Sequence, residues 1–219
     1  ASENDGATSL YTDEYIANYR RNNYLDPDAY PIIDWQDRLM TGNGFTHNHT
    51  LSMSAGSERI RVMTSLGYLD QNGIIKNANF KRYNLRNNMD IRMNDRLNFR
   101  LDIAATYSRR AANPYQSSVF GFMNSKDPLM LAQWSEGSYA PFTGGTVNPL
   151  PMIEQGVGGN NIRQNGTLKA SAALEYKPVQ WLTLEVKAAP QFTAVKTHKF
   201  VDLVEYHSDP YGTVSKTSN

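Results

Sequence analysis

The chain has 219 residues, 40% of them hydrophobic and 20% charged, and its 22 Lys and Arg against 21 Asp and Glu leave a formal net charge of +1. Its mean hydropathy of -0.57, with no run near the roughly 18 apolar residues that a spanning helix needs, excludes a helical membrane protein. The balanced charge gives no support for nucleic-acid binding. Thirteen tyrosines, eight phenylalanines and many Asn, Thr and Ser residues favour strands and turns, so the expected class is all-β.

Residues 1–44 lack the regular alternation of the later sequence. A helix is expected over residues 12–22, beginning at Thr12 or Asp13, and the proline-bearing segment LDPDAYP follows it. We interpret residues 1–44 as a large surface loop that contains a short helix.

From residue 45 to about residue 200, long runs of alternating apolar and polar residues are separated by turn residues. Residues 82–91 and 97–108 show this most clearly. Such a period is typical of a strand with two different faces. Residues 45–55 follow it weakly, because His47 and His49 share the face of Leu51. We expect about six strands over residues 45–200.

The connections between these strands alternate in length. Residues 55–58, 94–96 and 177–180 are short turns, whereas residues 71–79 are intermediate and residues 111–164 form a long excursion. Outer-membrane β-barrels have short periplasmic turns and long outer loops. The pattern predicts an antiparallel transmembrane β-barrel segment.

The same pattern assigns each connection to a side of the membrane. The excursion at residues 111–164 is predicted to be extracellular, as is the loop at residues 1–44. Residues 201–219 are expected to begin a further extracellular loop.

The strand directions also place the aromatic residues of the apolar face at two depths. Tyr68, Tyr83 and Tyr107 are predicted at its outer end, with Phe99 and Tyr176 at its inner end. These are the positions of the two aromatic girdles of such barrels, where the wall meets outer-membrane lipid. Eight residues separate Phe99 from Tyr107, which corresponds to about 20 Å of depth at a tilt of about 40°.

Exposed aromatic residues of the long loop are the candidates for ligand contact, because a rigid ring stacks well on a sugar or covers a peptide side chain. These residues are Tyr115, Trp134, Tyr139 and Phe142. Packing of the loop on itself is the alternative, and we favour it.

Catalytic and metal chemistry find little support in the sequence. His47 and His49 lack a third ligand at convincing spacing, and Asp26 and Asp28 fit a turn better than a calcium loop. With no cysteine in the chain and no motif that places a nucleophile, we expect no catalytic residue, no metal and no cofactor, and so no enzyme.

Two segments closely resemble the early barrel of the SusC/RagA family of TonB-dependent transporters. They are DWQDRLMTGNGFTHNHTLSMSAGSERIRV at residues 34–62 and SLGYLDQNGIIKNANFKRYNLR at residues 65–86. The matching positions are Asn48, Leu51, Ser52, Ser54, Gly56, residues 65–71 and 73–77, Phe80, Arg82, Tyr83 and Arg86. Ala55 departs from the family, which has a glycine pair at this turn.

This resemblance implies a larger protein in the bacterial outer membrane, with a signal peptide, a plug domain that meets TonB and a barrel of about 22 strands. The chain would be a fragment that lacks the plug. It implies import of oligosaccharides or oligopeptides with a SusD-like surface lipoprotein that captures the ligand.

Two other interpretations remain open at this point. A soluble β-sandwich, serving as a carbohydrate-binding or adhesin-like module, predicts one internal core and strands of about five or six residues. A small complete porin of about eight strands requires more strands than the sequence suggests.

Overall fold

The computed structural model describes residues 11–141, 147–154, 156–208 and 214–216. The chain forms two compact units. The sheet unit comprises residues 41–114 and 159–201, and the loop unit comprises residues 1–40, 115–158 and 202–219.

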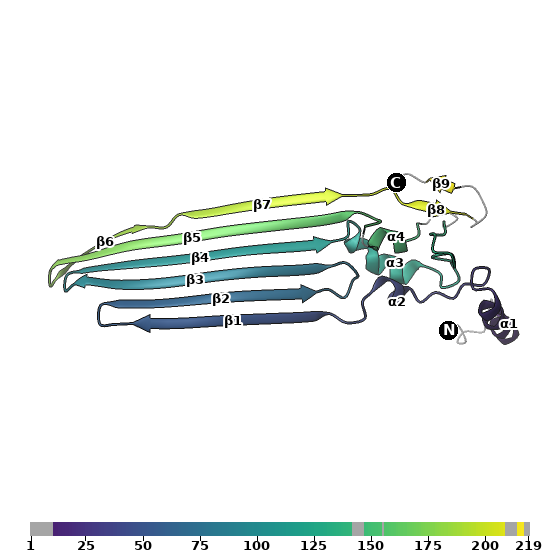
Figure 1. Cartoon of the computed structure of the whole chain (residues 1–219), viewed down its shortest axis with the longest axis horizontal. Helices are drawn as coiled ribbons and strands as arrows, with labels where there is room; N and C mark the ends of the chain where they lie inside the picture. Colours follow the sequence, from purple (N-terminus) through teal and green to yellow (C-terminus); the bar gives the residue numbers. More distant parts are fainter. Residues whose placement is uncertain (1–10, 142–146, 155, 209–213, 217–219) are drawn as a thin grey trace, which may run out of the picture. The chain divides into compact units, whose positions relative to one another are not determined.

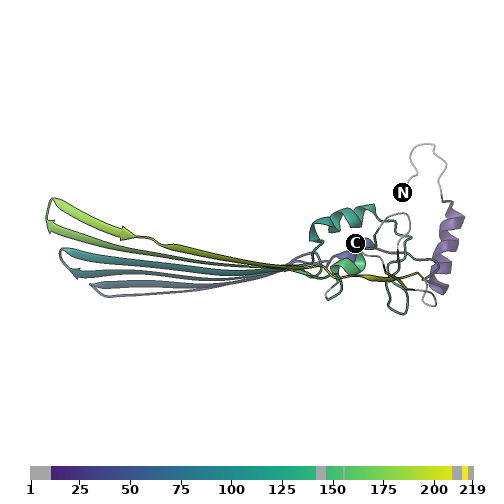
Figure 2. The same cartoon turned by 90° about the horizontal axis from the view of Figure 1, so that it is seen from above.

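The sheet unit is one antiparallel sheet in which the strands follow one another in chain order (Figure 1). The strands are β1 Phe45–Gly56, β2 Ile60–Asn72, β3 Asn79–Asn94, β4 Leu97–Ala112, β5 Asn160–Val179, β6 Leu182–Ala188 and β7 Gln191–Phe200. Viewed from above, these strands form a single curved layer (Figure 2). Their lengths of up to 20 residues far exceed the five or six residues usual in globular domains. The structure confirms the antiparallel barrel-type sheet and gives no support to the β-sandwich.

Strands β6 and β7 are two halves of one interrupted strand. Both pair with β5, and the register is the same on either side of the break, with Ala172 opposite Ala188 and Lys169 opposite Gln191. Pro190 interrupts the ladder because it has no N–H to donate, but its carbonyl oxygen still accepts from the Ala170 nitrogen at 3.0 Å. Seven strands therefore occupy six positions, in agreement with the six expected.

The short turns form where they were predicted. Between β1 and β2, the Ser57 hydroxyl accepts hydrogen bonds from the backbone nitrogens of Arg59 and Ile60 at 3.3 and 3.2 Å. Between β3 and β4, the Asn94 side chain accepts from the Arg96 nitrogen at 2.8 Å. Side chains that bond neighbouring backbone in this way favour tight turns.

The loop unit contains the helices and a small second sheet. Its elements are α1 Asp13–Leu25, α2 Trp35–Leu39, the 3-10 turn Gln116–Ser118, α3 Val119–Ser125, α4 Leu150–Ile153, β8 Glu205–His207 and β9 Val214–Lys216. The Thr12 side chain caps α1 by accepting from the Tyr15 nitrogen at 3.1 Å, which confirms the predicted helix and its start. None of the described helices is long and apolar enough to cross a membrane.

The bounds of the long excursion differ from those expected from the sequence. The long excursion between β4 and β5 spans residues 113–159, because both strands extend further than the expected limits of 111 and 164.

Candidate functional site

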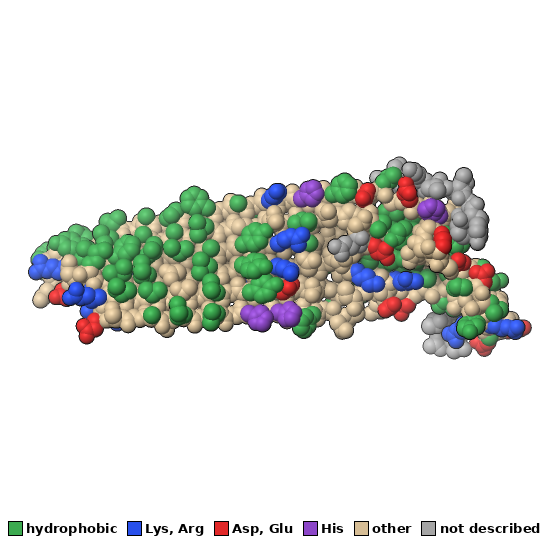
Figure 3. All heavy atoms as spheres, in the orientation of Figure 1, with side chains coloured by type: hydrophobic (Ala, Val, Ile, Leu, Met, Phe, Trp, Pro, Cys, Tyr) green, Lys and Arg blue, Asp and Glu red, His purple; other side chains and the backbone are tan. Residues whose placement is uncertain are grey.

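One face of the sheet, here called the apolar face, is hydrophobic across all six strand positions (Figure 3). Strand pairing places these residues on it: Leu51, Met53, Ala55, Val62, Leu66, Leu85, Met89, Ile91, Phe99, Leu101, Ile103, Ala105, Leu168, Ala170, Ala172, Leu174, Val186, Ala188 and Phe192. Leu51 and Met53 are each 67% exposed, and Val186 is 73% exposed. Side chains this apolar and this exposed need a non-aqueous environment.

Two polar side chains within the apolar face form a hydrogen bond with each other. Asn87 on β3 donates from its side-chain nitrogen to the Thr64 hydroxyl on β2, and the two atoms are 2.7 Å apart. A polar group left without a partner in hydrocarbon costs several kcal/mol. The cross-strand bond makes this pair compatible with lipid.

A row of aromatic rings crosses the apolar face from β1 to β4, which we call the tyrosine row. His49, Tyr68, Tyr83 and Tyr107 occupy paired positions on successive strands. Their neighbouring ring centroids are 6.4, 5.1 and 6.4 Å apart. The structure therefore places the three tyrosines predicted for the outer girdle side by side.

The two aromatic residues predicted for the inner girdle lie towards the other end of the strands. Phe99 is opposite Leu174, and Tyr176 is opposite Leu97, so the two are in neighbouring rows of the apolar face. That these rows mark the boundaries of a membrane stays a prediction.

The opposite face, here called the polar face, carries the charged residues of the alternation. Its cations include Arg61, Arg82, Arg86, Arg92, Arg100, Arg110, Arg163, Lys169, Lys177, Lys187 and Lys199, and its carboxylates are Asp90, Asp102, Glu175 and Glu185. Cations outnumber carboxylates on this face. A polar wall of this kind suits a water-filled or protein-filled interior.

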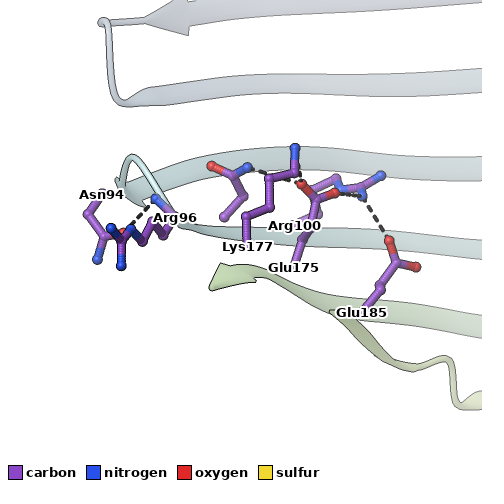
Figure 4. A network of polar contacts seen from close by, with 7 residues as sticks. Asn94, Arg96, Arg100, Glu175, Lys177 and Glu185 are labelled. Carbon is purple, nitrogen blue, oxygen red and sulfur yellow. Dashed lines mark hydrogen bonds and ion pairs between the residues drawn. The ribbon is translucent and has the colours of Figure 1, made fainter. Parts of the chain in front are cut away.

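A charged network on the polar face joins β4, β5 and β6 (Figure 4). The Glu175 carboxylate accepts from Lys177 at 3.0 Å and from Asn98 and Arg100 at 3.4 Å each. Arg100 also reaches Glu185 at 3.1 Å. The side chains of Arg100, Lys177 and Glu185 are 45–48% exposed and that of Glu175 is 19% exposed, and ion pairs in contact with solvent contribute little to stability. Their clearer effect is to fix the orientation of these side chains along the wall.

The loop unit has its own small core, built around one buried amide. Asn148 is 1% exposed, and its side-chain nitrogen donates to the carbonyl oxygens of Ala132 and Ala140 at 2.6 and 2.8 Å. Its side-chain oxygen accepts from the Leu150 nitrogen at 3.1 Å. Its backbone oxygen accepts from the Tyr206 hydroxyl at 3.3 Å. Burial and the neighbouring Tyr115 raise the pKa of Tyr206 to about 12.

The loop aromatics proposed for ligand contact are engaged within the loop unit. The Trp134 indole donates to the His207 carbonyl oxygen at 2.7 Å. The Tyr139 hydroxyl bonds the Glu154 carboxylate, and burial together with that bond raises the pKa of Tyr139. Tyr115 is half-buried, and Phe142 lies outside the described residues. These contacts favour loop packing, and ligand contact by these aromatics stays a prediction.

The histidine and aspartate pairs have structural roles. On β1, His47 meets Phe45 edge to face with ring centroids 4.2 Å apart, and it stacks with His49 at 6.2 Å. Asp26 closes a turn by accepting from the Ala29 nitrogen at 3.0 Å, as expected. Asp28 accepts from the Ser135 hydroxyl at 2.8 Å. Within the described part of the chain, no group of three His, Asp or Glu residues is arranged to hold a metal.

Comparisons with known proteins agree with this architecture. No protein-family model matches the chain. A TonB-dependent receptor of Formosa agariphila is 28% identical over 80% of this chain, which spans only 17% of that receptor. The TonB-dependent receptor SusC of Bacteroides thetaiotaomicron is 28% identical over 51% of this chain and 11% of its own length.

A solved structure shares the fold. The RagAB peptide importer in its closed-closed state superposes with a TM-score of 0.58 and 21% identity, over 84% of this chain and 21% of that chain. The chain thus spans between 11% and 21% of the length of these proteins. Sequence and fold together confirm the resemblance to SusC/RagA-type TonB-dependent transporters, with this chain matching a part of the antiparallel β-barrel and its loops.

Proposed function

We propose that this chain forms part of the wall and outer loops of a TonB-dependent transporter that imports oligopeptides or oligosaccharides across the bacterial outer membrane. The observation that carries the proposal is the division of the long-stranded sheet into an exposed apolar face and a charged polar face. In a barrel wall, the apolar face meets lipid and the polar face lines the interior.

The proposal assigns a side of the membrane to each end of the strands. The tyrosine row lies at the outer boundary, and residues 1–44, 113–159 and 201–219 belong to extracellular segments. The short turns at residues 57–59 and 95–96 then face the periplasm, because outer-membrane barrels have their short connections there.

Two partners follow from the proposed class. A SusD-like surface lipoprotein captures the ligand above the barrel, and TonB supplies energy through a plug domain outside this chain. The similarity to SusC and to the RagAB peptide importer supports both partners. The chain itself performs no covalent chemistry in this proposal.

Membrane fractionation tests the location and size of the assembled protein. Membranes of the source bacterium are run in SDS with and without boiling, and an antibody against residues 137–159 detects the protein. A large outer-membrane band whose mobility changes on boiling supports the proposal. A heat-indifferent band near the 24.7 kDa of this chain in the soluble fraction would favour the β-sandwich module instead.

Uptake assays test the transport itself. Cells that lack the protein, and the same cells complemented with it, receive labelled oligopeptides or labelled neutral oligosaccharides, with and without a proton uncoupler. Protein-dependent uptake of one class that the uncoupler abolishes identifies the substrate. Uptake that is the same with and without the protein for both classes would overturn the proposed transport.

A further inference from the structure

A row of polar, mostly charged side chains crosses the apolar face beside the tyrosine row, two residues further along each strand toward the proposed extracellular end. Strand pairing aligns His47, Asp70, Lys81, Arg109, Gln164 and Lys196 across six strand positions. Lys81 and Arg109 each lie two residues from a tyrosine of the tyrosine row, on the same face. Figure 3 shows basic and histidine side chains crossing the sheet in this way. We call Lys81, Arg109 and Lys196 the cation row.

The cation row carries a surplus of positive charge. The one carboxylate among the six aligned residues, Asp70, pairs with Lys81 at 3.2 Å and accepts from the Tyr68 hydroxyl at 2.9 Å. Gln164, between Arg109 and Lys196, donates to the Tyr107 hydroxyl at 2.9 Å. Among the described residues, neither Arg109 nor Lys196 forms an ion pair.

The spacing of Arg109 and Lys196 suits a multivalent anion. They stand two strands apart with only Gln164 between them, so their Cα atoms are separated by about 10 Å. Long flexible cationic side chains at this spacing can converge on one phosphate group, and arginine can bind two of its oxygens at once. The next paired row outward contains Phe45, Asn72, Asn79, Ala111, Ile162 and His198, and so adds no carboxylate.

We propose that the cation row binds the phosphate of an anionic lipid in the outer leaflet, with the acyl chains lying on the apolar face below the tyrosine row. The proposal rests on the lipid-facing orientation argued under the proposed function. Charge complementarity selects the headgroup, and the continuous apolar surface next to it selects a lipid over a free anion.

The test uses the full-length protein purified in detergent and titrated with monophosphoryl lipid A, with phosphatidylcholine as the zwitterionic comparison, and native mass spectrometry counts bound lipids. The test variant is K81Q/R109Q/K196Q. The control variant, R82Q/R110Q/K199Q, removes the same number of cations from the same strands on the polar face. An exposed cation contributes about fivefold to anionic-surface binding, so the test variant should bind lipid A at least tenfold more weakly.

Three results would overturn this inference: unchanged lipid A binding in the test variant, an equal loss in the control variant, or displacement of lipid A by millimolar inorganic phosphate. The last result would indicate an anion site without lipid. Heat-modified mobility in the same preparations reports separately whether the barrel is folded. Failure of the cation row is thereby distinguishable from failure of the barrel proposal.

Discussion

Placing an arginine in the middle of the apolar face should destabilise the inserted protein strongly, and the adjacent position supplies a matched control. Ala172 on β5 is paired with Leu101 and Ala188, about midway between the tyrosine row and the row of Leu97. Ser171, the preceding residue, lies on the polar face opposite Asp102. Ala172→Arg and Ser171→Arg therefore add the same side chain at the same depth on opposite faces.

The expected free-energy costs of the two substitutions differ because one side chain enters the apolar face and the other enters the polar face. An arginine on the lipid face near the bilayer midplane costs about 2–4 kcal/mol. An arginine at Ser171 stays in a polar environment next to the Asp102 carboxylate, so its cost should be less than about 1 kcal/mol. Ala172→Arg should therefore lower the insertion equilibrium by a factor of roughly 30 or more, since each 1.4 kcal/mol is tenfold.

The assay is urea-dependent insertion of the full-length protein into phosphatidylcholine vesicles, with the folded fraction read from the heat-modified band on a gel. The Ala172→Arg midpoint should move to clearly lower urea, while the Ser171→Arg midpoint stays near the wild-type value. Equal shifts of the two variants would refute the assignment of the apolar face to lipid.

Three further predictions concern the loop unit and the charged network. Asn148→Ala leaves buried backbone groups without hydrogen-bond partners, and each such group costs about 1–3 kcal/mol of stability. Protease should therefore cleave the loop unit faster, while the heat-modified mobility of the barrel stays unchanged. An unchanged rate of cleavage would contradict the role of this amide. An unfolded tyrosine ionises near pH 10 and Tyr206 at about 12, so the loop unit should lose stability as pH rises from about 10 to 12. Hydrogen exchange should show this loss in the wild type and a weaker one in Tyr206→Phe, and identical profiles would refute it. Glu175→Gln should leave the urea midpoint close to the wild-type value, because ion pairs in contact with solvent contribute little to stability. A clear drop of the midpoint would show that the network with Arg100 stabilises the wall.

The strands and their faces were predictable because a lipid-facing wall leaves a strict period of two in the sequence. Residues 97–108 show it most clearly, and β4 extends only a few residues beyond them. That Tyr68, Tyr83 and Tyr107 lie at the same end of the apolar face also followed from the strand directions, whereas their direct pairing is visible only in the register.

The loop unit was less predictable because its order comes from contacts that are distant in sequence. Helix α4 has four residues, too few to show a helical period. Asn148 resembles any loop asparagine until its partners at Ala132 and Ala140 are known. The buried Leu39 and Val119 belong to different segments of the chain, so local sequence could not show that they share a core.

The cation row could not be predicted from the sequence for a related reason. Lys81, Arg109 and Lys196 are far apart in sequence, and only the strand pairing aligns them beside the tyrosine row. The interruption at Pro190 likewise becomes intelligible only with the register, which shows that β6 and β7 continue one strand position.

The most direct test of the central claim is the environment of successive side chains along β5 in the membrane. Because the chain contains no cysteine, single cysteines at Ala170, Ser171 and Ala172 can carry a spin label in full-length protein reconstituted into bilayers, after removal of any cysteine elsewhere. Oxygen and a water-soluble nickel complex then report lipid and water exposure. A lipid-facing apolar face predicts high oxygen access at 170 and 172 and high nickel access at 171. Equal access at all three positions, or nickel access at 170 and 172, would contradict it.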